Sequence, residues 1–160
     1  MLTQDRLKEL FDYNPDTGIF VRLMQCGTAK KGAIAGCLAN GYYVIRVDNK
    51  LYLSHRLAWL YVHGSLPELV DHINRIPTDN RISNLRPATK AQNQQNHGIP
   101  KHNKSGFVGV SWDSNRSKWY ASIRANNRTI PLGRFQNIED AATAYQQAAG
   151  RYHTHNPFAK

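Results

Sequence analysis

Residues 69–97 read LVDHINRIPTDNRISNLRPATKAQNQQNH, and the rest of the chain is interpreted from this stretch. A short apolar run ends in the adjacent pair Asp71 and His72, and turn-forming residues follow at 74–80. A return strand is expected near residues 82–85, with Pro87 breaking it. Residues 88–96 favour a helix, since Ala, Lys and Gln are frequent there. The stretch predicts strand, loop, strand and helix, on which a carboxylate, an imidazole and several amides converge.

These side chains suit phosphodiester hydrolysis. A hard divalent cation takes oxygen ligands from carboxylates and amides, and it stabilises charge on a leaving oxygen. A neutral imidazole can accept a proton from the attacking water. Neighbours in a strand point to opposite faces, so Asp71 and His72 serve one site only if the chain bends there. The pair alone is more often part of an ordinary polar loop than of a site, and the larger pattern decides in favour of a site.

That pattern resembles the HNH nuclease family, in particular its small phage and intron members. The matching pieces are DHIN at 71–74, DNRISNLR at 79–86 and Asn93, preceded by SHRLAW at 54–59. The resemblance covers roughly residues 1–98 and implies a ββα-metal finger at about 69–97. It further implies His72 as general base, Asn84 as the residue that orients the His72 ring, and Asp71 with Asn93 as ligands of one Mg²⁺ or Mn²⁺.

Two histidines are further candidates. His97 lies four residues after Asn93 on the same helix face and is its rival as ligand, or a phosphate contact. The last letter of the family name is often a histidine, whereas Asn93 fits the spacing of the phage subgroup. His55 lies in the motif before the finger, although a structural role is the commoner one. Three arginines of the finger, Arg75, Arg81 and Arg86, are expected to contact DNA.

The segments before the finger form its support. Thr3 is expected to cap a first helix, and residues 19–23 to form a strand. A Gly- and Ala-rich loop spans 24–40. Strands at 41–47 and 50–53 flank a two-residue turn at Asp48 and Asn49. A helix at 55–63 is expected to begin after Ser54 as its cap and to end at Gly64.

The C-terminal part predicts a second folded unit. Strands are expected at 107–112, 118–125 and 128–135, followed by a helix that Asn137 caps and whose alanines pack on the sheet. Pro131 within the third strand indicates an edge position or a bulge. Three antiparallel strands and one helix make a small core.

The motifs GVSW at 109–112, LGRF at 132–135 and ExAAxAY at 139–145 resemble the DNA-binding domain of plant APETALA and ethylene-response factors. The match covers about residues 104–150. That family reads DNA with its sheet, and arginines and aromatics on such a ribbon suit phosphates and base edges. The expected DNA contacts are Trp112, Arg116, Trp119, Arg124 and Arg128. The alternative is that both tryptophans are core residues, which we expect for one of them.

The net charge indicates the kind of binding partner, and the cysteine content indicates the redox environment. The net charge is +10 over 160 residues, which points to a polyanion. Residues from 104 onward carry eight Lys/Arg against three Asp/Glu, so both parts share the surplus. The two cysteines form no CxxC pair, which favours a reduced, cytoplasmic setting. No apolar run is long enough for a membrane span.

The sequence thus predicts an α+β protein with a nuclease domain at 1–98, a linker at 99–105 and a sheet-plus-helix DNA-binding domain at 106–160. Its expected function is that of a metal-dependent DNA endonuclease of the homing type, encoded by a phage or mobile element. As a monomer it should nick double-stranded DNA, and a homodimer or two events would break both strands. A catalytically silent DNA-binding regulator and an RNA-binding or junction protein are the alternatives. The target sequence and the preferred metal stay open.

Overall fold

The computed structural model describes residues 2–96, 98–100 and 102–155. They form two compact units, Met1–Lys90 and Ala91–Lys160. The division falls before the linker that we expected at 99–105. Its physical reason is visible at helix α3 (Lys90–Gln95), where Gln92 donates to Thr154 Oγ1 over 3.3 Å and Gln95 accepts from the backbone N–H of His155 over 3.2 Å. The helix is thereby tied to the C-terminal segment.

The first unit begins with helix α1 (Gln4–Leu10), capped as expected by Thr3, whose hydroxyl accepts from the Arg6 N–H over 3.2 Å. Strand β1 (Phe11–Asn14) follows directly and pairs antiparallel with β2 (Ile19–Arg22). Strand β1 was not predicted from the sequence. Phe11 and Tyr13 alternate with exposed residues and join Leu7 and Phe20 in the core, so burial extends the chain at this point.

A three-stranded antiparallel sheet comes next, formed by β3 (Cys37–Ala39), β4 (Tyr42–Val47) and β5 (Lys50–Leu53). The turn between β4 and β5 is the predicted one, and both Asp48 and Asn49 have positive φ, at 45° and 64°. Such a turn matches the twist of paired strands. Strand β3 lies within the expected loop and was not predicted. Ile45 and Val47 place one face of the sheet in the core.

Helix α2 (Ser54–His63) packs Leu57, Ala58 and Leu60 into the same core. The expectation that Ser54 caps it was wrong, because Leu53 is the N-cap and Ser54 is already helical and buried. Gly64 ends the helix as predicted, in the left-handed conformation with φ 74°.

The finger itself consists of β6 (Leu69–His72), a short 3₁₀ turn at Ile82–Asn84 and β7 (Leu85–Ala88). The two strands pair antiparallel with Asp71 opposite Arg86 and His72 opposite Leu85. Pro87 does not break the return strand, as we had expected, but pairs within it opposite Val70. A two-stranded hairpin has an outer side on each strand, where the missing N–H of proline costs no ladder bond.

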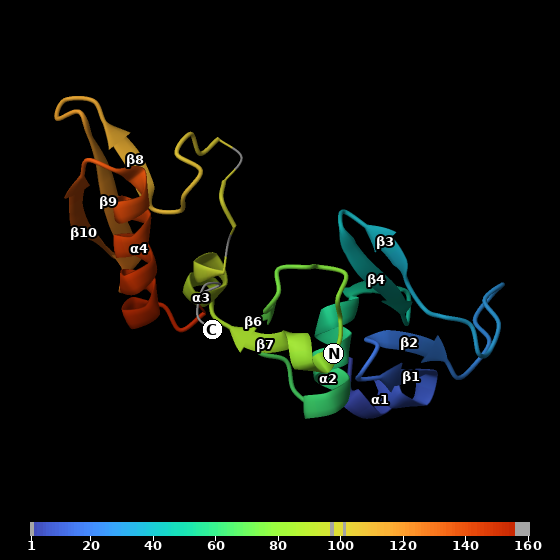
Figure 1. Ribbon diagram of the computed structural model, residues 1–160. Coiled ribbons are helices and arrows are strands. Elements are labelled where there is room, and N and C mark those ends of the chain that lie inside the picture. The colour runs from blue at the N-terminus through green and yellow to red at the C-terminus, as the bar shows by residue number, and fades with distance from the viewer. Residues whose placement is uncertain (1, 97, 101, 156–160) are drawn as a thin grey trace. The chain divides into compact units, whose positions relative to one another are not determined.

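The second unit contains β8 (Val110–Asp113), β9 (Lys118–Ala125) and β10 (Arg128–Phe135) in the order β10-β9-β8, with helix α4 (Ile138–Tyr152) along one face (Figure 1). Strands β9 and β10 match the expected bounds. Strand β8 starts later than predicted, after Gly106 and Gly109, both at positive φ. The bulge between Pro131 and Gly133 confirms the prediction for this proline. Four alanines of α4 are buried against the sheet: Ala141, Ala142, Ala148 and Ala149.

No described helix is long and apolar enough to cross a bilayer.

Candidate active site

His72 lies at the end of β6 and is only 6% exposed. Its Nε2 is 3.3 Å from Oδ1 of Asn80, and its ring lies 4.7 Å from the His55 ring and 6.2 Å from the Tyr42 ring, centroid to centroid. Burial lowers the pKa of His72, against smaller raising effects of Asn80, Asp71 and Asp79. The ring is therefore neutral at neutral pH, which is the form that accepts a proton.

His55, at the start of α2, is 5% exposed, and its Nδ1 has no hydrogen-bond partner among the described residues. Burial, with smaller contributions from His72 and Arg56, lowers the pKa of His55 to about 3. His55 is consequently a neutral ring. The Tyr42 ring lies 5.7 Å from the His55 ring, and both rings contact that of His72.

Asp71 is 7% exposed and forms an ion pair with Arg86 across the hairpin. Nε of Arg86 donates to Oδ2 of Asp71 over 3.0 Å, and Nη2 of Arg86 lies 2.9 Å from the same oxygen. Arg86 was expected to contact DNA. In this structure its guanidinium forms an ion pair with the carboxylate of the expected metal ligand, and its charge compensates a carboxylate that burial would otherwise penalise.

The chain does not bend between Asp71 and His72. Strand pairing continues through His72 opposite Leu85, and the turn follows at once, where Arg75 N–H donates to the His72 carbonyl over 3.0 Å and Arg75 takes φ 62°. Successive side chains of a strand point to opposite faces. The pair accordingly has different partners: Asp71 contacts Arg86, whereas His72 contacts Asn80 and the two rings of Tyr42 and His55.

Asn84 was expected to orient the His72 ring, and in this structure the Asn80 side chain lies within hydrogen-bond distance of that ring. Both polar atoms of the Asn84 side chain bind the loop backbone: Oδ1 accepts from the Asn74 N–H over 3.0 Å and Nδ2 donates to the Asp79 carbonyl over 2.8 Å. Asn84 therefore closes the loop 73–84. Asn80 is 4% exposed, and its side chain is the one beside the ring. The sequence contained this residue in DNRISNLR, but its partner depends on how the loop folds back.

Asp79 fixes the outer side of the loop. It accepts from Arg81 Nε over 2.8 Å and from Arg81 Nη2 over 2.6 Å, and also from Asn74 Nδ2 over 2.7 Å. Arg81 is the main cause that lowers the pKa of Asp79 to about 2. Arg81 remains about half exposed, so the guanidinium expected to contact DNA lies at the surface, bound to Asp79.

The β1–β2 hairpin contacts the loop 73–84 and holds it in place. The Tyr13 hydroxyl donates to the Asn80 carbonyl over 2.7 Å, and Ile82 N–H donates to the Pro15 carbonyl over 3.1 Å. Gly18, at φ 73°, lies against the Asn80 backbone so closely that any Cβ would collide with it. The β1–β2 hairpin thus sets the position of Asn80 and, through it, the His72 ring.

Two further residues, Asn93 and His97, were expected as metal ligands. Asn93 is on α3, in the second unit, and His97 lies outside the described residues. Among the described residues no three His, Cys, Asp or Glu side chains gather into a metal-holding group. The buried Asp71 carboxylate is nevertheless a hard oxygen donor of the kind Mg²⁺ and Mn²⁺ take, usually with one or two carboxylates and retained waters. The donor chemistry of the first unit therefore fits such an ion.

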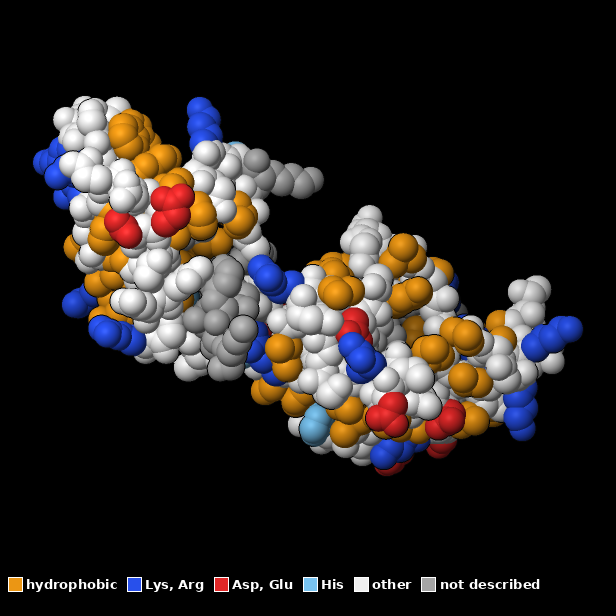
Figure 2. All heavy atoms as spheres, viewed as in Figure 1, with side chains coloured by type: hydrophobic (Ala, Val, Ile, Leu, Met, Phe, Trp, Pro, Cys, Tyr) orange, Lys and Arg blue, Asp and Glu red, His pale blue; other side chains and the backbone are white. Residues whose placement is uncertain are grey.

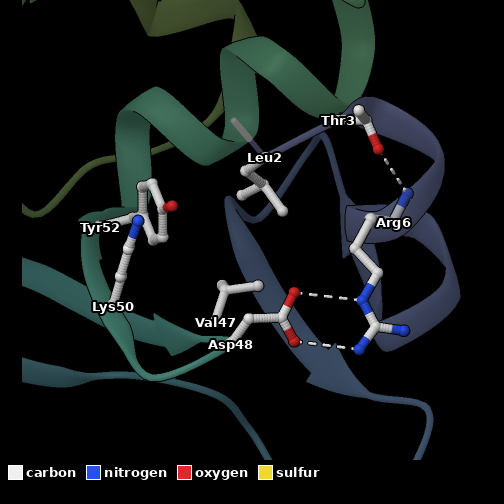
Figure 3. A pocket seen from close by; sticks show the side chains of 7 residues that line it. All are labelled: Leu2, Thr3, Arg6, Val47, Asp48, Lys50 and Tyr52. Atoms are coloured by element: carbon white, nitrogen blue, oxygen red, sulfur yellow. Dashed lines mark hydrogen bonds and ion pairs between the residues drawn. The ribbon is translucent and has the colours of Figure 1, made fainter.

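A hollow of about 370 Å³ in the first unit is not this site. It lies between α1 and the β4–β5 hairpin, and Figure 3 shows Arg6 pointing at Asp48 across it. Arg6 donates to both carboxylate oxygens of Asp48, over 3.2 Å and 2.9 Å, so the charges are paired. The residues that line it are Leu2, Thr3, Arg6, Val47, Asp48, Lys50 and Tyr52, none of which is an expected site residue.

The register of the second unit distributes the expected DNA contacts over both faces of its sheet. Trp112 and Trp119 are opposite each other on the face that carries α4, and Trp119 packs on the core beside Ala121. Arg124 is on the other face. Lys118, Tyr120 and Arg134 share that outer face, and Lys118 and Tyr120 were not predicted from the sequence. The buried Ala121 and Ile123 gave the signal, because they fix the inward positions of KWYASIRA.

Arginines of the second unit have local partners. Arg134 lies over the Tyr120 ring at 5.1 Å and donates to Asp113 over 2.8 Å, and Arg116 lies 3.4 Å from the same carboxylate. Arg128 is exposed at the start of β10, opposite Ala125. Figure 2 shows Lys and Arg side chains scattered over the visible face of each unit rather than gathered in one patch.

Known proteins match the part of the chain that contains the candidate site. Residues 52–95 match a family described as HNH endonuclease, a span from His55 through His72 to Asn93. The chain is 30% identical over 108 residues to "Protein 3.8" of Escherichia phage T7, covering 66% of this chain and 87% of the phage protein. No solved structure matches. The HNH resemblance is confirmed, and the resemblance of residues 104–150 to the plant DNA-binding domain stays a prediction.

Proposed function

The chain belongs to the family of Protein 3.8 of Escherichia phage T7 and carries an HNH endonuclease domain, and we propose that it is a metal-dependent DNA endonuclease with His72 as general base. The observation that carries the proposal is a buried, neutral imidazole held by Asn80 and two rings, one residue from a buried carboxylate. Buried titratable groups with shifted pKa values are typical of catalytic sites.

In the proposed reaction His72 takes the proton of the water that attacks phosphorus. When Asn80 Oδ1 accepts from Nε2, the lone pair is on Nδ1, and Asn80 thereby selects the tautomer. Because burial lowers the pKa of His72, the ring is not already protonated at neutral pH. The P–O bond opposite the entering water then breaks, and the leaving oxygen carries the charge.

Asp71 and Asn93 would hold one Mg²⁺ or Mn²⁺, with His97 as the alternative to Asn93. Because β6 stays extended through Asp71 and His72, their action on one phosphate requires the end of β6 to change its conformation when metal and DNA bind. The ion would stabilise the charge on the leaving oxygen. Arg86 keeps the Asp71 carboxylate fixed and charge-compensated at the strand position. An arginine bound to this carboxylate also favours a second candidate function, a DNA-binding regulator with a silent nuclease fold, because the same oxygen cannot serve both cations without rearrangement.

The second unit would supply much of the affinity for double-stranded DNA. Its outer sheet face presents Lys118, Tyr120, Arg124 and Arg134, and phosphate contacts by such residues make binding salt-dependent. Arg75 and Arg81 would add contacts near the cut. One finger holds one strand at a time, so we propose nicking by a monomer, a double-strand break by a homodimer, and action in the cytoplasm of an infected cell.

Relaxation of supercoiled plasmid separates the two candidate functions. With Mg²⁺ or Mn²⁺ the endonuclease should convert the plasmid to the open circle, and EDTA should stop it. A regulator would shift the plasmid in a gel without cutting it. Phage genomic DNA should be tested beside the plasmid, so that a rare target is represented. Competition between duplex DNA and duplex RNA identifies an RNA-binding protein, because only that protein would prefer the A-form duplex.

A further inference from the structure

A second hollow of about 370 Å³ lies in the second unit, between the turn 102–105 and the outer strand β8. Trp112 and Trp119 form one side, and His102, Lys104 and Ser111 lie around it. Its volume falls in the range of small-ligand sites in proteins. The outer sheet face with Arg124 is a separate surface, because Trp112 and Trp119 are on the face that carries α4.

The two indoles have unequal surroundings. Their ring centroids are 5.0 Å apart at an interplanar angle of 68°, so one ring meets the other edge-on. Trp119 is half-buried against the core, whereas Trp112 is 51% exposed. Burying a tryptophan is strongly favourable, since it removes a large apolar surface from water. An anchored indole that holds an exposed one beside a hollow therefore presents a stacking surface to a ligand.

The side of the hollow opposite the two tryptophans is the turn 102–105, and hydrogen bonds hold this turn in place. Asn103 Oδ1 accepts from the backbone N–H groups of Ser105 and Gly106 over 2.8 Å and 2.9 Å, and Asn103 Nδ2 donates to the Phe107 carbonyl over 2.9 Å. Ser105 Oγ lies 2.8 Å from the Val110 carbonyl at the start of β8. These bonds tie the turn to the strand, so a ligand would find the hollow already formed and pay little to order it.

From these features we propose that the hollow binds a single unstacked base of DNA. An aromatic base stacks on an indole without regard to sequence, and Lys104 offers a positive charge to the adjoining phosphate. The outer backbone edge of β8 offers hydrogen bonds to the base edge. A base in an intact duplex is covered on both sides by its neighbours, so the site takes an unpaired one.

This inference rests on the proposed function, because it requires DNA as the partner. The test distinguishes failure of the base pocket from failure of DNA binding. The full chain is titrated in EDTA, which prevents cutting, with a blunt duplex and with the same duplex carrying one unpaired thymidine. A third duplex carries an abasic residue at that position. Tryptophan fluorescence and DNA anisotropy are both recorded. The protein should bind the thymidine bulge about tenfold more tightly than the abasic bulge, the size expected of one base–aromatic stack.

Trp112→Ala should remove that preference and leave blunt-duplex affinity within about twofold, as one stacking contact is lost. Tyr152→Ala is the matched control, because Tyr152 is an aromatic of similar exposure, 46%, at the end of α4. It should bind all three duplexes like the parent chain. Trp112→Phe keeps a ring and should retain part of the preference, which excludes misfolding as the cause.

Equal binding of the thymidine and abasic bulges by the parent chain would overturn the base pocket while leaving the endonuclease proposal intact. A loss by Trp112→Ala that is equal for all three duplexes would also overturn it, since Trp112 would then contact the backbone. Failure of the parent chain to bind any of the DNAs would overturn the proposed function itself.

Discussion

The rings of His55 and His72 meet edge to face, with centroids 4.7 Å apart and 66° between their planes. One ring comes from the first turn of α2 and the other from the last residue of β6, so helix and hairpin share a contact at the site. We predict that His55→Ala lowers the cleavage rate and destabilises the fold by about 1–3 kcal/mol, because it leaves a cavity beside His72. His55→Phe should restore most of both, measured by plasmid nicking and urea unfolding. Full activity of His55→Ala would contradict a positioning role.

His55 should also make stability depend on pH. Its pKa is depressed to about 3 in the folded chain, whereas a free histidine titrates near 6.5. The unfolded chain therefore binds a proton below pH 6.5 that the folded chain does not bind until about pH 3. The contribution of the neutral His55 ring to the free energy of unfolding is fully present above pH 6.5. It is lost as the pH falls toward 3, by at most about 1.4 kcal/mol per pH unit. In His55→Phe this part of the dependence should vanish, and an unchanged pH curve would refute it.

Substitution of Asn80 should mainly lower the cleavage rate, whereas substitution of Asn84 should mainly lower the stability of the fold. Asn80→Ala removes the partner of His72 Nε2, so the cleavage rate should fall by more than tenfold at roughly constant DNA affinity. Asn84→Ala leaves the Asn74 N–H and the Asp79 carbonyl without their bonds, which should cost about 1–3 kcal/mol of unfolding free energy. Thermal unfolding and nicking of both variants check this. Equal stability losses would show that both residues act only on the loop.

Removal of Arg86 should make stability sensitive to divalent cations. Arg86→Ala removes the guanidinium that is ion-paired with the buried Asp71 carboxylate, and losing one partner of a buried pair costs about 3–5 kcal/mol. Mg²⁺ should recover part of that loss, because a cation bound by Asp71 replaces the guanidinium charge. Arg86→Ala with Asp71→Asn should lose the Mg²⁺ response. If melting temperatures with Mg²⁺ and with EDTA agree in Arg86→Ala, Asp71 is not a ligand in the free protein.

Arg124 should contribute to the salt dependence of DNA binding. It lies on the outer sheet face, and neutralising one phosphate contact should lower the slope of log K against log salt by about 0.9. Arg151→Ala, in the last turn of α4, removes the same charge away from that face and should leave the slope unchanged. Titrations of a blunt duplex at several salt concentrations measure both. If Arg124→Ala and Arg151→Ala show the same slope of log K against log salt, the outer sheet face does not contact DNA phosphates through Arg124.

The sequence predicted the features that short-range chemistry determines. The turn at Asp48 and Asn49 needs only two residues that tolerate positive φ, and the alanine face of α4 follows from helical spacing. Strand β1 escaped prediction because four residues between a helix and a turn carry too little periodicity. Long-range contacts decided the rest.

The partner of His72 is one such contact. Asn80 rather than Asn84 reaches the ring, because Tyr13 and Pro15, far away in the chain, fix where the loop 73–84 folds back. The side of the sheet on which Trp112 lies depends on the pairing register with Trp119. Neither relationship is contained in a local pattern, whereas the alternation inside β9 was readable and would have identified Lys118 and Tyr120.

The most direct test of His72 as general base compares cleavage and binding in one variant. His72→Ala is assayed for plasmid nicking with Mg²⁺ and Mn²⁺, and its affinity for the same DNA is measured in EDTA. His63→Ala, an exposed histidine at the end of α2, serves as control. The account predicts that His72→Ala loses nicking by at least a hundredfold, in the range typical of general-base removal, and binds DNA like the control. Nicking by His72→Ala at the rate of the control would contradict it.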